Sequence, residues 1–599
     1  MCYNETMKNS MITKLYFRLL PMQVLLAVIM ALNGLVSGLF ASNFIGADAL
    51  SAVGLYNPVG FLVGAVSLVL LGGSQIMCGK FMANHKVNEM RSVFSLDILA
   101  SLIFGALLGA LLMVIVVSDC TPMFSPGNIS EEVETAFEKY LIGQAIGLIP
   151  LILGQQLFAF ISIEQQNKRS TAAIIISIVL NIILNYILIC VLNMGTFGLA
   201  LASAISNWGF MLILAQYFFT DRATLKFTTK GIKPGWLKDI FMIGSPSALV
   251  QGYQMFRGLI VNSLVLTYVG EIGLSAFSAS NSLLAIFWAL PLGTQVVSRM
   301  LLSVADGEED RRSLTDIMRT VIYKCIPLTL CMAAFISAMA VPFTGFFYDD
   351  PSQPVFQMTV NAFRILPLAM PFSVFCLSFD SYGQVSGKQF LVHSNVALDG
   401  VICVALFSAI LIPVIGMDGL YAANVLNGVV TVLEFVLYSW IIKKHFPKNM
   451  DELMVIPDDF GARDEDKLDI SIQSIEEVLT TSQSVQEFCL AHGVDKKKSY
   501  YGALCLEEMA GNIVEHGFDK DKKKHTILVR VVYNPKSLLL RIKDDCVPFD
   551  PEEHRDIFDT SDACSNIGIR MVYKIADDID YQYIFGLNVL TMKINVDSN

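Results

Sequence analysis

The chain has 599 residues, of which 54% are hydrophobic and only 16% are charged, and its formal net charge is −11. Soluble proteins carry about 25% charged residues, so this composition is typical of a membrane protein. The acidic balance argues against nucleic acid as a partner, because nucleic acids select basic surfaces. The twelve cysteines are scattered without a CxxC pair, and their spacing predicts neither a metal cluster nor a disulfide framework.

Residues 1–16 form a polar N-terminal segment, and residues 17–442 consist of apolar stretches separated by short polar breaks. A helix that crosses a membrane needs about 20 mostly apolar residues. Twelve stretches meet this requirement, so the sequence predicts an all-α membrane domain of twelve transmembrane helices in contact with lipid. The predicted spans are 17–41, 51–76, 95–117, 139–162, 170–191, 196–220, 239–268, 274–301, 321–346, 358–383, 392–414 and 417–442.

Basic residues gather in alternate connections between these spans. Lys80 and Arg91 lie in one such connection, Arg311 and Arg312 lie in another, and the intervening connections carry mostly Asp and Glu. Because connections rich in Lys and Arg remain on the cytosolic side, we expect both termini to be cytosolic. The chain is then a multi-pass protein of the bacterial inner (plasma) membrane.

The membrane part contains an internal repeat. FIGADALSAVGLYNP at 44–58 parallels YVGEIGLSAFSASNS at 268–282, and Gly73 matches Gly293 a little further on. Parallel repeats of this kind are one of the common plans of transporters, with a substrate site between the halves. The sequence therefore predicts two six-helix repeats in the same orientation, at about 17–220 and 239–442.

Three stretches carry a family resemblance. NFIGADALSAVGLYNPVGFLVGAVSLVLLGGSQIMCGKFMANHKVNEMRSVF at 43–94, VLNIILNYILICVLNMGTFGLALASAISNW at 179–208 and GSPSALVQGYQ at 244–254 resemble the multidrug and toxic compound extrusion (MATE) family. The resemblance implies a V-shaped, two-lobed transporter with alternating access. It also implies export of small organic cations or drug-like substrates, driven by inward flow of Na⁺ or H⁺.

Two positions depart from the family pattern. Many members carry an acidic residue where this chain has Ser37, and some carry a Glu where it has Gln254. A carboxylate can bind and release a coupling ion, whereas a hydroxyl or an amide is neither anionic nor titratable. The coupling ion is therefore left open by the sequence.

Other polar groups inside the spans are candidates for the substrate or ion pathway. Arg257 lies near the middle of its span, where it pairs with a carboxylate such as Asp380, binds an anionic substrate, locks helices together or reaches toward an interface. Asn33 and Asn281 are further candidates, although such amides commonly form hydrogen bonds between helices.

The C-terminal part of the chain has a different pattern. Residues 443–467 lack periodicity and read as a linker, and residues 468–599 mix helical and strand patterns. A strand is predicted for KLDISIQ, and helices are predicted for residues 472–491, 497–516 and 564–576. A first hairpin is predicted for HTILVRVVY with SLLLRIKDD, and a second for DDIDYQYIF with NVLTMKIN. The sequence therefore predicts an α/β sandwich.

Chemistry is concentrated in three motifs of this region. In LCLEEMAGNIVEHGF at 504–518, Glu508, Asn512 and His516 recur every four residues on one helix face. The carboxylate can act as a base and the amide oxygen can hold Mg²⁺ beside phosphates. RIKDDCVPFDP ends a strand in Asp544, which can accept from the amine of adenine, and SNIGIRMV leads into a helix whose N-terminus suits phosphate.

These motifs resemble the ATP-binding fold shared by histidine kinases, gyrase and Hsp90 (GHKL), and most of all the anti-sigma-factor serine kinases. The resemblance covers about residues 468–599 and implies ATP and Mg²⁺ as cofactors. It implies Glu508 as general base, Asn512 as Mg²⁺ ligand, Asp544 as adenine anchor and Gly568 in the phosphate lid. It also implies that the remaining nucleotide-binding residues are His516, Asp545, Phe549 and Asn566.

Two departures bear on this assignment. Cys546 replaces a Gly that lets the adenine pocket close, and Ser565 and Asn566 stand where the lid usually has glycines. Asn tolerates positive φ only in part, so the alternative is a degenerate domain that binds ATP weakly.

Three functions are compatible with the sequence. The first is an ion-coupled organic-cation exporter whose tail senses ATP or a cytosolic protein partner. The second is a membrane sensor whose tail is a serine kinase, or a slow ATPase, with a protein phospho-acceptor. The third is a flippase for lipid-linked substrates. The missing carboxylates at Ser37 and Gln254 favour the second, and the intact repeat favours the first.

Overall fold

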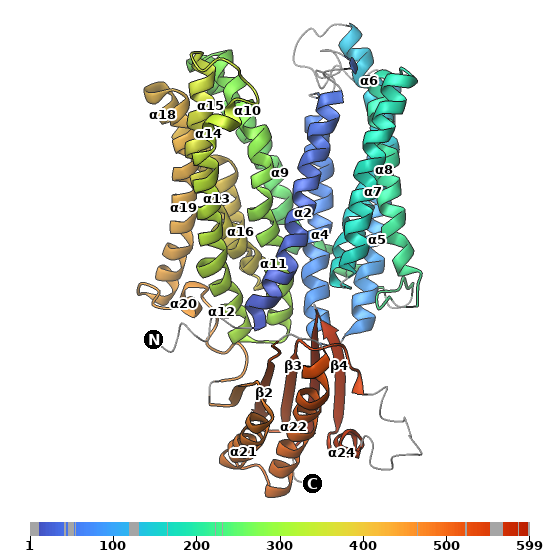
Figure 1. The fold of residues 1–599 in the computed structure, drawn as a ribbon, viewed down its shortest axis with the longest axis vertical. Coiled ribbons are helices and arrows are strands. Elements are labelled where there is room, and N and C mark those ends of the chain that lie inside the picture. Colours follow the sequence, from blue (N-terminus) through green and yellow to red (C-terminus); the bar gives the residue numbers. More distant parts are fainter. Residues whose placement is uncertain are drawn as a thin grey trace. The chain divides into compact units, whose positions relative to one another are not determined.

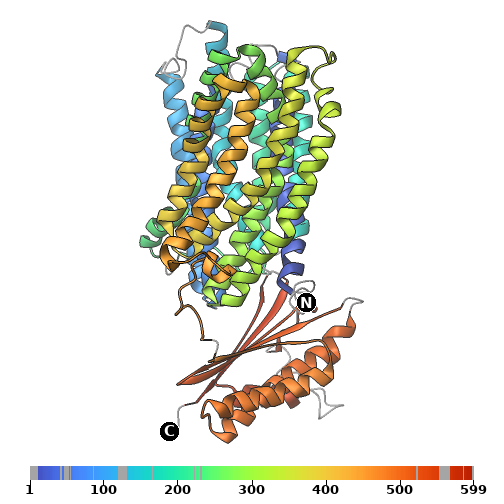
Figure 2. The same cartoon turned by 90° about the vertical axis from the view of Figure 1, so that its left-hand side faces the viewer.

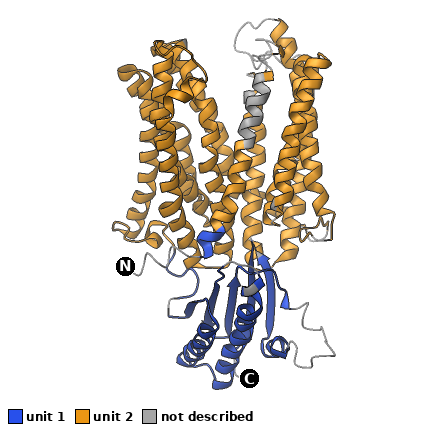
Figure 3. Cartoon of the chain, viewed as in Figure 1, with its two compact units in different colours: residues 1–15, 457–599 blue, residues 16–456 orange. Residues whose placement is uncertain are grey.

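The computed structural model describes residues 11–40, 44–45, 53, 55–84, 86–118, 131–164, 166–221, 223–229, 232–463, 465–520, 524–551, 567–584 and 586–596. The chain divides into two compact units, which Figure 3 distinguishes by colour. Residues 16–456 are called the membrane unit here, and residues 457–599 together with 1–15 are called the tail unit.

The first half of the membrane unit is a series of long apolar helices. Their starts follow local chemistry: Pro58 occupies the first turn of α4, where its missing N–H costs nothing. Glu131, Glu132 and Glu134 lie in the first turn of α6, where the helix dipole favours negative charge. The helices are α2 (Met11–Phe40), α4 (Asn57–Ala83), α5 (Val87–Val117), α6 (Glu131–Ile163), α7 (Asn167–Asn185) with the π-helical η3 (Tyr186–Val191), and α8 (Gly195–Phe218).

The second half repeats this plan with more interruptions. Asp310 caps α12 by accepting from the backbone N–H of Ser313 at 2.9 Å, and Pro354 begins α15. The elements are α9 (Gly235–Tyr268), α10 (Glu271–Phe287), α11 (Ala289–Gly307), α12 (Arg311–Thr320), η4 (Val321–Cys325), α13 (Ile326–Ala338), α14 (Ala340–Thr344), α15 (Pro354–Ile365), η5 (Leu366–Ala369), α16 (Met370–Val385), α17 (Gln389–Ala397), η6 (Leu398–Ile402), α18 (Cys403–Ile415) and α19 (Met417–Lys443).

Ten helices in the described part of the chain are long and apolar enough to cross a membrane. The pair α10 and α11, bent by 41°, adds an eleventh if it forms one span. Helix α9 occupies the predicted span 239–268 but is not among them, since Gln251, Gln254 and Arg257 make its middle less apolar. The helical membrane fold is confirmed, and the count of twelve spans stays a prediction.

The two halves pack against each other through matching glycines. A Cβ at Gly73 of α4 would lie 2.2 Å from the carbonyl oxygen of Ile240 in α9. A Cβ at Gly293 of α11 would lie 2.6 Å from the side chain of Val24 in α2. The repeat-related glycines therefore allow close helix crossings, of α4 with α9 and of α11 with α2, and Figure 1 labels these four helices.

A short helix follows the last long helix of the membrane unit. Helix α20 (Met450–Leu453) begins at Asn449, whose side chain accepts from the N–H of Glu452. It packs against α12 and α19, and Arg311 forms an ion pair with Asp451 at 2.9 Å. Part of the stretch predicted as linker is thus ordered against the second half of the membrane unit.

The tail unit is one antiparallel sheet covered by helices on one face, as Figure 2 shows. The strand order is β1-β2-β3-β5-β4, and every predicted strand and helix of this region is present. The elements are β1 (Lys467–Ile472), α21 (Ile475–Ala491), α22 (Lys496–Gly517), η7 (Phe518–Lys520), β2 (Ile527–Asn534), β3 (Ser537–Asp544), α24 (Ile567–Ile575), β4 (Asp578–Ile584) and β5 (Leu587–Asn595).

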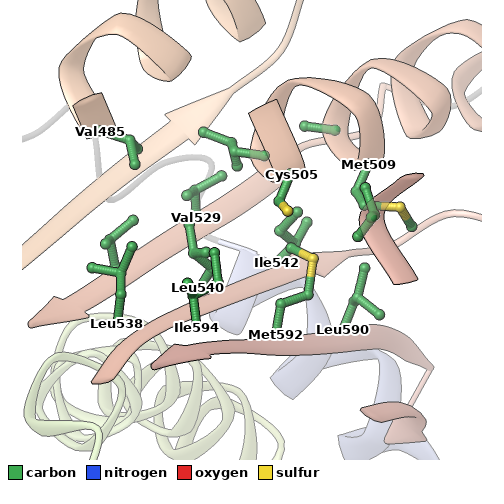
Figure 4. Close-up of a cluster of buried hydrophobic side chains, with 14 of the residues drawn as sticks. Val485, Cys505, Met509, Val529, Leu538, Leu540, Ile542, Leu590, Met592 and Ile594 are labelled. Carbon is green, nitrogen blue, oxygen red and sulfur yellow. The ribbon is translucent and has the colours of Figure 1, made fainter. Parts of the chain in front are cut away.

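The core of the tail unit lies between the sheet and its helices. Successive side chains of a strand point to opposite faces of the sheet, so every second one faces the helices, as Val529 and Val531 of β2 do. Helix α22 contributes Cys505 and Met509 to the same cluster, which Figure 4 shows in close-up. This packing fixes α22 on the sheet and so decides which of its side chains remain outside the core.

Candidate functional site

The middle of α22 carries two polar side chains that lie outside the hydrophobic core. Glu508 and Asn512 are both half-buried and lie one helical turn apart. The residues that α22 buries in the core are instead Cys505, Leu506, Met509 and Ala510. A carboxylate and an amide oxygen are thus side by side on a face that the core does not use.

Gly568 in the first turn of α24 lies directly against Glu508. A Cβ at Gly568 would be 2.0 Å from Oε2 of Glu508, so a side chain at this position would force the Glu508 carboxylate to move. The structure therefore brings the predicted base and the predicted lid glycine together. The N-terminus of α24, where the helix dipole favours a phosphate, lies beside the carboxylate.

Asp544 ends β3 and is buried, with 2% of its surface exposed. Its Oδ1 accepts from the side-chain amide of Asn588 at 2.7 Å and from the backbone N–H of Cys546 at 3.0 Å. Burial raises the pKa of Asp544, and these hydrogen bonds oppose the rise. The carboxyl group is consequently held in one orientation, as recognition of a base edge requires.

Asn588 extends this network to the loop after β3. The hydroxyl of Tyr581 donates to Asn588 Oδ1 at 2.7 Å and accepts from the backbone N–H of Phe549 at 3.1 Å. Sequence reasoning missed Asn588 and Tyr581. The register of β3 with β5, which places Asn588 opposite Asp544, is what makes them partners.

The side chain of Cys546 fits beside the end of α22. Its side chain is buried, and a Cβ at Gly517 would lie 3.2 Å from the Cys546 sulfur. The absence of a side chain at Gly517 leaves room for the thiol that replaces the usual glycine.

The other predicted nucleotide-binding residues have different surroundings. Oδ1 of Asp545 accepts from the N–H of Thr526 at 3.2 Å and lies 3.1 Å from Nδ1 of His525. Phe549 is half-buried, with Lys520 Nζ 5.9 Å from its ring centroid. His516 is exposed, and Asn566 lies outside the described residues.

In the membrane unit, Asp380 of α16 is buried near Arg299, a cation that sequence reasoning missed. Asp380 is within electrostatic range of Arg299 from α11, and both side chains are at most 5% exposed. Among the described residues, Oδ1 of Asp380 and Nε of Arg299 have no hydrogen-bond partner. The spans thus contain a buried charge pair whose hydrogen-bonding capacity is not fully used.

Two further carboxylates lie in the same half of the unit. Asp399 of η6 accepts from the amide of Asn427 at 2.7 Å, and Glu434 of α19 accepts from Asn395 at 2.9 Å and from Ser394. Both are within electrostatic range of Asp380. The three carboxylates form an acidic cluster inside the second half.

Among the other predicted pathway residues, Arg257 is within electrostatic range of Asp399 in this cluster. Nη2 of Arg257 donates to Oδ1 of Asn424 at 3.1 Å, so the cation beside Asp380 is Arg299. Gln254 and Asn281 are exposed on the surface of the helices. Asn33 and Ser37 belong to α2, but their side chains lie outside the described residues.

The first half of the membrane unit contains a single buried acid of comparable depth among the residues described. Asp97 of α5 accepts from the hydroxyl of Ser74 in α4 at 2.6 Å, and its Oδ2 has no partner. Sequence reasoning missed Asp97 because it lies in a span whose other residues are mostly apolar.

The halves are also joined by an ionic contact near the end of α4. Nζ of Lys80 lies 2.8 Å from Asp306 of α11 and donates to the carbonyl of Val385 in α16 at 2.6 Å. Lys388 lies nearby, and burial lowers the pKa of this lysine to about 8. This contact holds the halves together at the end that carries the basic connections.

Comparison with known proteins agrees with both parts of this description. The MatE family model matches residues 24–187 and 246–414, which together make up more than half of the chain. The model of the histidine kinase-like ATPase domain matches residues 473–594. No curated protein matches the chain.

Solved structures share the membrane fold. A transporter of the MOP superfamily from Pyrococcus furiosus, described as having a binding pocket of reverse polarity, aligns with a TM-score of 0.66 at 22% identity over 73% of this chain and 97% of its own. An outward-facing multidrug resistance MATE family transporter aligns with a TM-score of 0.65 at 22% identity over 73% and 98%. The chain therefore belongs to the MATE family of transporters and carries a C-terminal domain of the histidine kinase-like ATPase type.

Proposed function

We propose that this protein exports small organic cations across the bacterial plasma membrane in exchange for inward H⁺ or Na⁺, with both termini in the cytosol. We further propose that its tail unit binds ATP with Mg²⁺ and regulates transport. A solved relative is described as a multidrug resistance transporter, which supports this class of substrate.

The observation that carries the transport proposal is the acidic cluster of the second half. Asp380, Asp399 and Glu434 outnumber the two nearby guanidinium groups, those of Arg299 and Arg257. An excess of carboxylates in a buried site favours a cationic occupant. It also supplies the coupling group that Ser37 and Gln254 lack, and Asp380, with an unpartnered oxygen, is the member best placed to take up an ion.

The ionic contact of Lys80 with Asp306 supports an outward-facing state. It lies at the end of the bundle where basic connections predict the cytosol. Closure there leaves access from the opposite side, so we infer that release of this contact accompanies opening toward the cytosol.

The residues of the tail unit fit ATP and Mg²⁺. Asp544 would accept from the exocyclic amine of adenine, and the oxygen of Asn512 would hold Mg²⁺ at the phosphates. The bound metal would neutralise phosphate charge. Glu508 lies against Gly568 at the N-terminus of α24, where it can orient and deprotonate an attacking hydroxyl or water.

Transport from proteoliposomes tests the first part of the proposal. We expect efflux of a fluorescent organic cation when a pH or Na⁺ gradient is imposed, and loss of efflux in Asp380→Asn. Asn512→Ala should abolish ATP binding and any response of efflux to ATP, while gradient-driven efflux remains. Efflux that needs no gradient and survives Asp380→Asn would contradict ion coupling.

A serine kinase is a second candidate function, favoured by the position of Glu508. A half-buried carboxylate between α22 and the lid helix is placed to deprotonate a protein hydroxyl. Incubation of cytosolic extract with the protein and labelled ATP should then give a phosphorylated protein that is absent with Glu508→Gln. If no protein is labelled while the wild type still transports, the kinase function is excluded and regulation of transport by ATP remains as the function of the tail.

A further inference from the structure

Three potential metal ligands meet at the end of the β2–β3 hairpin. Nδ1 or Nε2 of His525, a carboxylate oxygen of Asp545 and Sγ of Cys546 all lie within 4.8 Å of one another. His525 and Cys546 are buried, each 5% exposed, and Asp545 is half-buried. Asp545 also belongs to the residues that the resemblance assigns to nucleotide binding, whereas no predicted role of the nucleotide site involves His525 or the thiol of Cys546 as a ligand.

The strand register explains why these residues meet. Ile527 of β2 pairs with Asp544 of β3 in the antiparallel ladder. Continuing the same register by two residues places Thr526 opposite Asp545 and His525 opposite Cys546. The arrangement is therefore built into the hairpin. The cysteine spacing of the sequence does not reveal it, because the cluster contains one cysteine and its histidine lies far from it in the chain.

We propose that His525, Asp545 and Cys546 bind one divalent ion of the zinc class. Imidazole, carboxylate and thiolate are together the donors that Zn²⁺ prefers, whereas Mg²⁺ and Ca²⁺ prefer oxygen alone. Tetrahedral zinc with bonds of about 2.0–2.3 Å separates its ligand atoms by roughly 3.3–3.7 Å. The 3.1 Å between His525 and Asp545 is already close to this separation.

The ion would join the beginning of β2 to the turn after β3. That turn is also held to Asp544, since the N–H of Cys546 donates to its carboxylate. Zinc would therefore fix the backbone beside Asp544. The consequence for ATP rests on the proposed nucleotide site, whereas metal binding itself does not.

Cobalt titration of the metal-free, full-length protein in detergent tests the proposal. We expect one equivalent of Co²⁺ to bind with a thiolate charge-transfer band. The band should be absent in Cys546→Ser, and the affinity should fall at least about tenfold in His525→Ala. Cys331→Ser, which removes an exposed thiol of the membrane unit, is the matched control and should bind like the wild type.

A measurement on the wild type keeps the test independent of how the variants fold. Zinc X-ray absorption should show one sulfur at about 2.3 Å together with nitrogen and oxygen at about 2.0 Å. No binding, a shell of oxygen and nitrogen alone, or a thiolate band that persists in Cys546→Ser would overturn the proposal. ATP titration of the same samples reports separately on the nucleotide site.

Discussion

Asp544 of the tail unit and Asp380 of the membrane unit are both buried acids, but their surroundings differ. Asp544 is 2% exposed, and one of its oxygens receives two N–H donors. Asp380 is 5% exposed, has two acidic neighbours and leaves an oxygen without a partner among the described residues. A satisfied carboxylate is suited to recognising a fixed ligand, whereas an unsatisfied one is suited to binding and releasing an ion.

The largest expected effect is that of Asp380→Asn. Loss of the negative charge should lower gradient-driven efflux from proteoliposomes by about 100-fold or more, because an amide is not anionic and does not titrate. ATP binding should be unchanged. Asp418→Asn, at a half-buried acid that accepts from Asn361 in the same half, is the matched control and should transport normally. Equal losses in both variants would contradict a special role for Asp380.

Asp544→Asn should have the next largest effect, on ATP binding. A hydrogen bond to a charged group contributes about 1.5–3 kcal/mol, so we expect a dissociation constant raised roughly 10- to 150-fold in a nucleotide titration. The fold should survive, since both N–H donors meet Oδ1, and the amide oxygen of Asn can accept them. ATP binding like that of the wild type would exclude Asp544 as the adenine anchor.

The elements of both units could be predicted from sequence because their patterns are local. Long apolar runs indicated the membrane helices, and alternation indicated the strands of the tail. Glu508 and Asn512 could be assigned to one face because their spacing is that of a helix turn. The core packing of α22 agrees with this assignment, because both side chains lie outside the hydrophobic cluster.

The partners of the buried charges could not be predicted, because they depend on contacts between distant segments. Arg299 is hidden in a mostly apolar stretch, and only the packing of α11 on α16 places it near Asp380. Nothing in the sequence distinguishes Asn588 from other strand residues, and only the register of β3 with β5 places it opposite Asp544. Periodicity carries no information about either pairing.

Asn588→Ala should have a smaller effect, on the stability of the tail unit. The change removes the amide donor of Asp544 and leaves the Tyr581 hydroxyl without its acceptor, at a cost of about 1–3 kcal/mol. Chemical denaturation of the full-length protein, followed at the tail transition, measures this loss. Asn534→Ala, at an exposed end of β2, should lower the stability of the tail unit much less. Similar losses of stability in the two variants would contradict a stabilising role for the hydrogen bonds of Asn588.

The smallest effect is the pH dependence of that tail transition. Burial raises the pKa of Asp544 above that of the unfolded chain, so between the two pKa values the folded state binds more protons. The contribution of Asp544 to stability is therefore complete below the unfolded pKa of about 3.9 and is lost as pH rises through the folded pKa. Relative to Asp544→Asn, the wild-type tail should become less stable as the pH rises above the unfolded pKa of about 3.9.

ATP affinity should change with pH in the opposite direction, because the adenine amine requires the ionised carboxylate. Binding by the wild type should strengthen as pH rises through the raised pKa of Asp544, while the weak binding by Asp544→Asn shows no such step. Opposite slopes for stability and affinity are expected where ionisation of a buried group costs folding free energy but is required for recognition. Parallel slopes would assign the pH dependence to another group.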